Sequence, residues 1–202
     1  MMTTFLLIRH GLTDAVGHSM TGHEPGVHLN ALGRDQAASL PRRLGGVPLA
    51  AIYASPLERT RETAQPVADA RGLPVQIEPR FIEVDFGGWT NQRFADMASD
   101  PGWVLYNAYR GVTRPPRGEG LLDVQRRTVD ALLELQARHP GDVVAVFSHA
   151  DTIRAMLLYF LGMPVDFVQR LELSPARISV LQLGACAPRV LQVNGDTAPA
   201  LA

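Results

Sequence analysis

Two histidines directly follow predicted buried strands, where a folded chain could use them for chemistry. His10 comes shortly after the apolar run Thr4 to Ile8, and His149 shortly after the apolar run Val143 to Phe147. In open α/β sheets the ligand site lies beyond the carboxyl ends of the strands. A neutral imidazole can attack as a nucleophile or transfer a proton. Either histidine alone would be a hydrogen-bonded turn residue, but together they indicate a catalytic site at one sheet edge.

Two arginines accompany these histidines. Arg9 precedes His10, and Arg59 lies in the first turn of a helix that starts near the Ser55-Pro56 step. All 19 basic residues are arginine, which excludes a P-loop and a Schiff-base lysine. Genomic base composition accounts for most of that bias. Guanidinium groups nevertheless match oxyanion oxygens two at a time, so the sequence favours an anion as the ligand.

Composition limits the remaining classes of function. The 202 residues are 46% hydrophobic and 19% charged, which indicates one globular domain over 1–202. A formal charge of −1 argues against nucleic acid or an acidic membrane as a partner. The apolar runs are too short for a signal segment or a membrane span, so we expect a cytoplasmic protein. Cys186 is the only cysteine, which rules out an internal disulfide and a cysteine-based zinc cage.

The hydrophobic pattern predicts strands that alternate with helices. The expected strands are Thr4–Ile8, Leu49–Ala54, Val75–Glu78 at an edge, Val143–Phe147, Phe167–Leu173, Ile178–Leu183 and Val190–Val193. The expected helices are Ala31–Leu44, capped by Asn30 and burying Leu32, Ala37 and Leu40, then Leu57–Arg71, Leu121–His139 and Thr152–Leu161. This order predicts a three-layer α/β/α sandwich around a mostly parallel sheet. We expect an irregular insertion over the site at about 89–120 and a loose tail at about 194–202.

Four motifs in this order resemble the histidine phosphatase superfamily, which includes the cofactor-dependent phosphoglycerate mutases. They are Leu7–Gly11, Ser55–Ala64, Glu83–Gly87 and Ser148–His149. The short Arg-His-Gly step alone is a weak signal, but the ordered set is specific. The resemblance covers the chain from Phe5 to about Leu183.

The resemblance implies a covalent phosphohistidine mechanism. His10 would be the nucleophile, Arg9, Arg59 and His149 would bind the transferring phosphoryl group, and Glu83 would be the proton donor. Such a site needs no metal and no cofactor, because guanidinium and imidazole groups can stabilise the charge on the phosphoryl oxygens. The implied substrate is a small phosphorylated metabolite. Without the resemblance, Glu83 would be interpreted as an exposed loop carboxylate.

Three further residues are candidates for substrate contact. Gly11 suits a close approach of the backbone to phosphate, or only a turn, and Thr21 and Gly22 resemble a family pair that contacts substrate. Three histidines are spaced by five residues, which matches neither one helix face nor a zinc motif. We therefore expect loop residues rather than metal ligands at His18, His23 and His28.

Departures from the mutase pattern favour a phosphatase. The run Leu12 to Val16 lacks the asparagine that mutases carry, and Ala150 replaces the usual glycine after His149. A family segment of the form Pro-Gly-Gly-Glu-Ser appears as Pro116 to Gly120. Mutase activity and a non-catalytic phosphate-binding module remain the alternatives, and a homodimer stays open. A nucleotide-binding protein is disfavoured because no strand is followed by Gly-x-Gly-x-x-Gly.

The insertion contains residues of two kinds whose role the sequence leaves open. Its aromatic side chains could line a specificity pocket or form a satellite core: Trp89, Phe94, Trp103, Tyr106 and Tyr109. Its arginines could fold over the site and hold a carboxylate: Arg110, Arg114 and Arg117.

Overall fold

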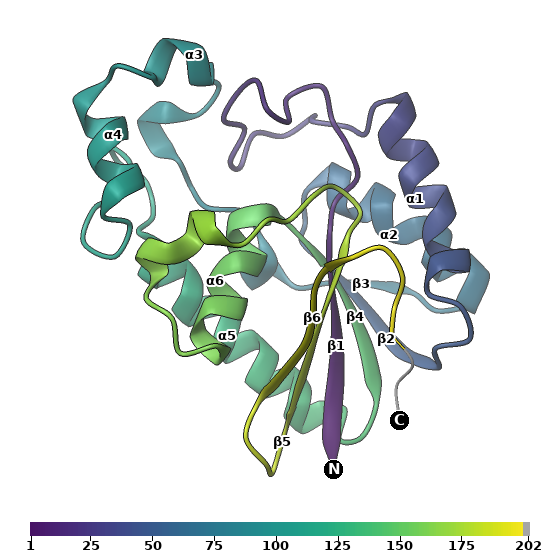
Figure 1. Cartoon of the computed structure of the whole chain (residues 1–202). Coiled ribbons are helices and arrows are strands. Elements are labelled where there is room, and N and C mark those ends of the chain that lie inside the picture. The colour runs from purple at the N-terminus through teal and green to yellow at the C-terminus, as the bar shows by residue number, and fades with distance from the viewer. Residues whose placement is uncertain (200–202) are drawn as a thin grey trace.

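The computed structural model describes residues 1–199, and its centre is a six-stranded sheet (Figure 1). The strands are β1 (Met2–Arg9), β2 (Leu49–Ala54), β3 (Val75–Ile77), β4 (Val143–Ser148), β5 (Ile178–Gly184) and β6 (Arg189–Gly195). Their order is β3-β2-β4-β1-β5-β6; the first four strands pair in parallel, β5 pairs antiparallel with β1, and β6 pairs antiparallel with β5. The mostly parallel sheet and the edge position of β3 are therefore confirmed.

Helices cover both faces of the sheet (Figure 1). Helices α1 (Ala31–Arg43) and α2 (Glu58–Arg71) lie on one face, and α5 (Leu121–Arg138) and α6 (Ala150–Phe160) lie on the other. Alternate residues of β1 enter the two cores: Leu6 packs with α1 and α2, whereas Leu7 packs with α5 and α6. The continuous apolar runs are thus explained by burial on both faces, as three layers require.

Helix α1 begins at the predicted cap but buries a different face from the one expected. The Asn30 side chain accepts a hydrogen bond from the Gly33 N–H at 2.9 Å. Ala37 and Leu40 are buried, but Leu32 is 54% exposed, so its predicted burial is wrong. Gly33 is buried instead, against the backbone of Leu12, since adjacent residues point about 100° apart around a helix.

The stretch from 89 to 120 is more regular than expected. It contains α3 (Phe94–Met97) and α4 (Pro101–Ala108), which lie beyond the carboxyl ends of the strands (Figure 1). Asp100 caps α4 by accepting from the N–H groups of Gly102 and Trp103 at 2.7 and 3.0 Å. The Asp100-Pro101 step is a helix-start signal that is present in the sequence. The many glycines and prolines around it nevertheless predict loops, so the sequence does not predict a helix of only eight residues.

The predicted strand Phe167–Leu173 is wrong. Residues Val165–Arg170 form a 3₁₀ helix, and Val165 and Val168 are its buried side chains. A spacing of three matches the 3₁₀ repeat rather than the two-residue repeat of a strand.

The end of the chain is also more ordered than a loose tail from 194 would be. Strand β6 continues to Gly195, and the Ala198 N–H donates to the Arg43 carbonyl at 3.2 Å. The last part of that predicted tail, 200–202, lies outside the described residues.

Candidate active site

Strand pairing brings the two histidines together. Strands β1 and β4 pair in parallel with Arg9 opposite Ser148, and the His10 N–H donates to the Ser148 carbonyl at 3.0 Å. The imidazole rings of His10 and His149 consequently lie 5.4 Å apart between centroids.

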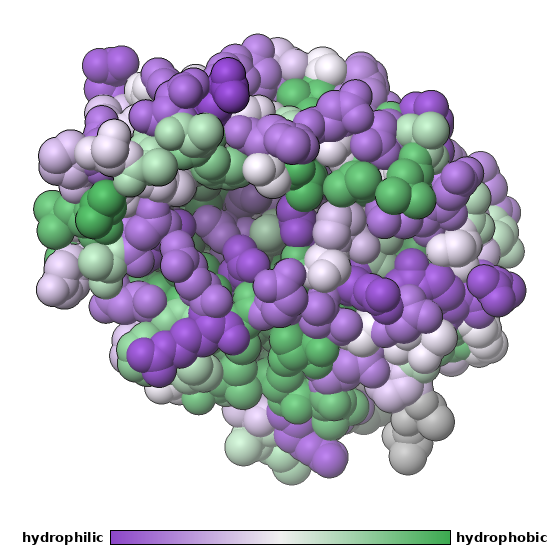
Figure 2. All heavy atoms as spheres, turned by 45° about the horizontal axis from the view of Figure 1, so that its top comes forward, coloured by the Kyte–Doolittle hydropathy of each residue, from purple (hydrophilic) through white to green (hydrophobic). Residues whose placement is uncertain are grey.

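A cavity of about 340 Å³ opens beside the His10 ring, whereas His149 is fully buried and does not line it. Figure 2 shows the hollow at this end of the molecule. It is lined by Arg9, His10, Thr13, Ala15, Val16, Gly17, Ser19, Met20, Thr21, Gly22, Arg59, Glu83, Phe86, Phe94, Ala150, Asp151 and Arg154.

The hydrogen bond of His10 determines which ring nitrogen is free. Nδ1 lies 2.7 Å from the Gly11 carbonyl, which can only accept, so Nδ1 carries the proton. Nε2 of the neutral ring therefore keeps its lone pair. Burial, together with the charges of Arg9 and Arg59, lowers the pKa of His10 well below its ordinary value. The arrangement keeps the His10 imidazole neutral near pH 7, with Nε2 available for chemistry.

His149 carries its ring proton on the same nitrogen as His10. The Leu57 N–H donates to the Ser55 hydroxyl oxygen at 3.4 Å, and the same hydroxyl lies 2.8 Å from His149 Nε2. Ser55 therefore has its own proton available for Nε2, which leaves the ring proton on Nδ1. That Nδ1 is buried and has no partner within residues 1–199. Burial and the charge of Arg59 lower the pKa of His149 well below its ordinary value.

The two arginines are each held by one backbone carbonyl. Arg9 Nη1 donates to Leu173 at 2.6 Å, and Arg59 Nη2 donates to Gly22 at 2.8 Å. Three of their other nitrogens, Arg9 Nε and Arg59 Nε and Nη1, are buried without a partner within residues 1–199. Burial lowers the pKa of both guanidinium groups below their ordinary value. Unpaired buried donors are rare in proteins, and here they indicate an anion site.

Glu83 is positioned through both its backbone and its side chain. Its carbonyl accepts from Arg127 Nη2 at 3.0 Å and faces His23 Nε2 at 2.7 Å. Its Oε1 accepts from the Val84 N–H at 3.0 Å and lies 2.9 Å from the Thr152 hydroxyl. Burial and the nearby negative charge of Asp151 raise the pKa of Glu83 above its usual range. A carboxyl group in this state can donate a proton.

Of the three further candidates for substrate contact, two line the cavity. Thr21 and Gly22 are on its wall, and Gly22 has a φ of +48°, which favours glycine. Gly11 is not on the wall, because it faces α1 instead. A Cβ at Gly11 would lie 2.7 Å from the Gly33 carbonyl oxygen, so close packing against α1 explains this glycine.

The cavity wall also contains charged residues that the sequence reasoning missed. Asp151 and Arg154, in the first turns of α6, are paired at 2.9 Å, and Asp151 binds Arg110 at 3.0 Å on its other side. Burial alone would raise the pKa of Asp151, but these two guanidinium groups hold it below its ordinary value. The only available signal was the i, i+3 spacing of opposite charges directly after His149.

The insertion contributes little to the cavity. Its aromatic side chains mostly form the satellite core, in which Trp89 and Tyr106 are buried, whereas Tyr109 is exposed; Phe94 alone of the five reaches the cavity. None of its three arginines lines the cavity. Arg110 is buried and bound to Asp151, and exposed Arg114 lies 3.6 Å from Asp123.

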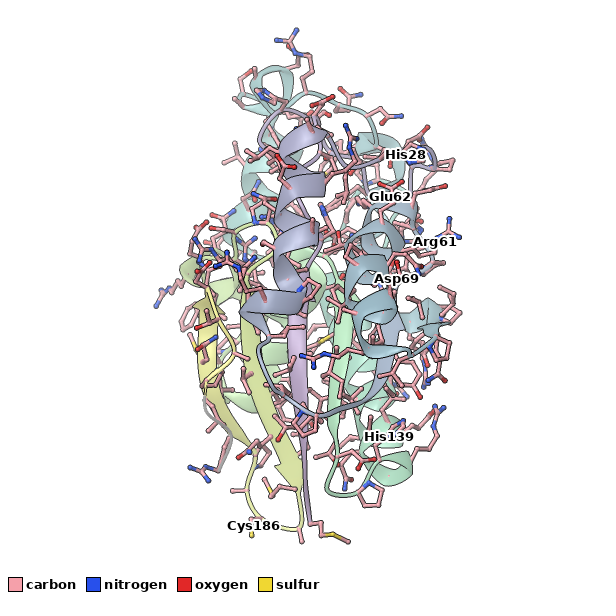
Figure 3. The ribbon with its side chains drawn as sticks, turned by 90° about the vertical axis from the view of Figure 1, so that its right-hand side faces the viewer. His28, Arg61, Glu62, Asp69, His139 and Cys186 are labelled. Carbon is pink, nitrogen blue, oxygen red and sulfur yellow. The ribbon has the colours of Figure 1, made fainter. Side chains whose placement is uncertain are left out.

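The three evenly spaced histidines lie in loops, as expected. His28 points toward Glu62 on α2 (Figure 3), and His23 contacts the Glu83 carbonyl. Residues 1–199 contain no group of three histidine, cysteine, aspartate or glutamate side chains that could hold a metal ion. In the same part of the chain, no helix is both long and apolar enough to cross a membrane.

Comparisons with known proteins agree with this fold and show its family. A family model described as histidine phosphatase superfamily (branch 1) matches residues 5–196. Phosphoserine phosphatase 1 of Hydrogenobacter thermophilus is 31% identical over 200 residues, which cover 96% of this chain and 92% of that protein. A bifunctional protein of Mycobacterium tuberculosis is 32% identical over 96% of this chain, which spans only 54% of that protein's length.

Solved structures give the same result at the level of the fold. The mycobacterial glucosyl-3-phosphoglycerate phosphatase has a TM-score of 0.86 at 27% identity, covering 96% of this chain and 100% of that chain. The match of the family model to nearly the whole chain, together with these similarities, shows that the protein belongs to branch 1 of the histidine phosphatase superfamily.

Proposed function

We propose that the protein hydrolyses phosphomonoesters without a metal, through a covalent phosphohistidine on His10. The observation that carries this proposal is a set of unpaired donors beside the nucleophile. Seven buried side-chain nitrogen and oxygen atoms lack a partner within residues 1–199, and four of them belong to Arg9, Arg59 and His149. Donors of this kind stabilise the charge that develops on the equatorial oxygens during phosphoryl transfer.

In the first step, Nε2 of neutral His10 attacks the phosphorus. The P–Nε2 bond forms while the bond from phosphorus to the ester oxygen breaks. Glu83 gives its proton to that oxygen, which would otherwise leave as a high-energy alkoxide. The raised pKa of Glu83 supports this role, because it favours the protonated form of the carboxyl group.

In the second step, the ionised Glu83 takes a proton from water as the water oxygen attacks phosphorus. The P–Nε2 bond breaks, phosphate leaves, and His10 and Glu83 return to their starting states. A mutase would instead return the phosphoryl group to its product. Hydrolysis is supported by the insertion arginines, since Arg110, Arg114 and Arg117 are absent from the cavity wall and provide no clamp for a carboxylate.

The substrate in this proposal is a small phosphorylated metabolite whose leaving group carries an acidic group. Arg154 lies on the wall, and its Nη2 makes no hydrogen bond within residues 1–199, while Nε and Nη1 are held by Leu171 and Asp151. Arg154→Ser should raise KM for anionic esters more than for p-nitrophenyl phosphate. Arg126→Ser, at an exposed position of α5 away from the cavity, is the control.

The decisive experiment is to trap the phosphoenzyme. Labelled phosphoester is mixed with the protein and quenched in base, and the label is located by peptide mapping. We expect base-stable label on His10, none in His10→Ala, and unchanged turnover with a chelator. Turnover in His10→Ala, or its loss with the chelator, would refute the mechanism.

A second measurement separates hydrolysis from transfer. The protein is given 3-phosphoglycerate with a trace of 2,3-bisphosphoglycerate, and both 2-phosphoglycerate and free phosphate are followed. If the two phosphoglycerates interconvert faster than phosphate is released, the protein is a mutase. If no residue becomes labelled in the trapping experiment and no substrate is turned over, the protein is a binding module.

A further inference from the structure

A second polar cavity lies between α1 and the segment that follows β6, near the point where the Ala198 N–H donates to the Arg43 carbonyl. Its volume is about 370 Å³, within the range of small-ligand sites. It shares no lining residue with the candidate active site. Its lining residues come from α1, from the loop before β5 and from the segment after β6: Gln36, Ser39, Arg42, Arg43, Pro175, Arg177, Asp196 and Thr197.

The charge of this lining is strongly positive. Three arginines face one carboxylate, that of Asp196, so the wall carries two uncompensated positive charges. The chain as a whole has a net charge of −1, so this local excess is not a general property of the protein. Burial and the charges of Arg177 and Arg42 lower the pKa of Arg43 below its ordinary value, although the Asp196 carboxylate acts in the opposite direction. The positive groups are therefore close enough to repel one another.

Arg43 forms a fixed base for the cavity. Its side chain is only 10% exposed, its Nε donates to the Asp196 carbonyl at 2.7 Å, and its Nη2 donates to the Ala176 carbonyl at 2.7 Å. These bonds hold the guanidinium group in place, and its Nη2 also lies 3.3 Å from the Asp196 carboxylate, which Arg43 shares with Arg177.

The remaining groups of the wall are mostly free donors. Within residues 1–199, Arg42 donates no side-chain hydrogen bond, and Arg177 uses only Nη1, which binds Asp196. Gln36 accepts from the Leu12 N–H through Oε1, so its amide N–H groups are left as donors. A wall rich in donors and poor in acceptors complements an oxyanion.

We propose that this cavity is a second oxyanion site, which binds a phosphate group. Arg42 and Arg177 are its direct ligands, since Arg42 makes no side-chain hydrogen bond within residues 1–199 and Arg177 keeps Nε and Nη2 free, and Arg43 supplies a fixed positive charge behind them. Asp196 occupies part of the site as an internal counter-ion. Inorganic phosphate and the phosphate of a small monoester share this chemistry.

Amide NMR tests the proposal because it separates the two cavities in one titration. The ¹⁵N-labelled full chain is titrated with inorganic phosphate, and separately with phenylphosphonate, with chloride at equal ionic strength as the reference. We expect saturable shifts at the amides of Arg177 and Thr197, with a midpoint different from that at His10. A response to phenylphosphonate alone assigns the site to esters, and a response to phosphate assigns it to the free ion.

Removing a positive charge from this cavity and removing its negative charge should have opposite effects on phosphate binding. Arg42→Ser and Arg177→Ser should each weaken binding at Arg177 and Thr197 roughly tenfold, which is the effect of one lost charge-assisted contact. Asp196→Asn should tighten it, because the internal competitor is removed. Arg126→Ser, on α5 outside both cavities, should change nothing. Arg42 is exposed and the Arg177 side chain is 39% exposed, so neither replacement threatens the fold.

Three results would overturn the proposal: non-saturable shifts at these amides with both anions, equal affinity in the arginine variants, or weaker binding in Asp196→Asn. The outcome is independent of the proposed function, because the amides that report this site lie outside the active-site cavity and no turnover is measured.

Discussion

At the scale of single residues, His10 is kept neutral by the same arginines that would bind the phosphoryl group. Arg9 and Arg59 both lower the pKa of His10, in addition to the effect of burial. A dianion bound between them would offset their charges during the reaction. The free imidazole therefore needs no separate base to activate it, unlike a serine nucleophile.

Arg59→Lys tests whether the fork geometry matters rather than the charge. Arg59 holds Gly22 with Nη2 and keeps two further nitrogens free, and a single ammonium group cannot reproduce both. We expect kcat/KM to fall by a few hundred-fold, about 3 kcal/mol in transition-state binding. Arg61→Lys, two residues further along α2 and exposed (Figure 3), is the matched control. Near-normal turnover of Arg59→Lys would contradict the bidentate interpretation.

Glu83→Gln tests the proton donor. The amide keeps the hydrogen-bonding shape but has no transferable proton. Esters with poor leaving groups should be slowed severely, whereas p-nitrophenyl phosphate, whose leaving group needs little protonation, should be spared. The comparison of the two substrates within one variant controls for folding. Equal slowing of both would assign Glu83 to phosphate binding or to structure.

At the scale of elements, one buried ion network joins the insertion to α6. Asp151 near the start of α6 binds Arg154 on its own helix and Arg110, which follows α4. Arg110 also donates to Asn107 at 2.8 Å, so the end of α4 is held against α6. The wall of the active site is therefore built partly by an element whose own side chains stay outside the cavity.

Asp151→Asn should separate the structural effect of this network from its electrostatic one. Loss of the carboxylate leaves the buried Arg110 without a counter-charge, which should lower the free energy of unfolding by about 3 to 5 kcal/mol. Asp96→Asn is the control: it removes an exposed carboxylate 3.8 Å from Arg93 and should change the free energy of unfolding by less than about 0.5 kcal/mol. Urea unfolding of the two variants measures both values.

The same variant should also alter the pH dependence of activity. Asp151 raises the pKa of Glu83, so its neutralisation should move the alkaline limb of the kcat profile to lower pH. If the alkaline limb stays at the same pH in Asp151→Asn, Asp151 does not influence Glu83.

At the scale of the whole molecule, three buried groups make stability depend on pH in opposite directions. His10 and His149 have lowered pKa values in the folded state, so below about 6.5 the unfolded chain takes up protons that the folded chain does not, and stability falls with falling pH. Glu83 has a raised pKa, so its contribution is present below about 4.5 and is lost as pH rises through its folded value.

Because two histidines oppose one glutamate, the net effect between pH 7.5 and 5 should be destabilisation as the pH falls. Each histidine contributes a limiting slope of about 1.4 kcal/mol per pH unit. His10→Asn should reduce the slope of the unfolding free energy against pH by the contribution of one histidine. Urea titrations at half-unit pH steps measure it, and a flat profile in the parent protein would contradict the burial of two neutral histidines.

The local sequence determined the elements that place the reacting groups. Apolar runs that end on Arg9 and on Ser148 predict buried parallel strands, and the carboxyl ends of such strands meet at one sheet edge. Asn30 predicted the start of α1 for a similarly local reason, because its side chain caps its own helix. The family motifs carried the remaining candidates, including Glu83.

Only the tertiary structure decided what the rest of the cavity wall is made of. Arg110 reaches Asp151 across 41 positions of sequence, and Gly11 is explained by its approach to Gly33. The 3₁₀ helix at Val165–Arg170 could not be told from a strand, since a short apolar run fits both. Periodicity reports only which face of an element is buried, whereas these contacts depend on which elements the closed chain brings together.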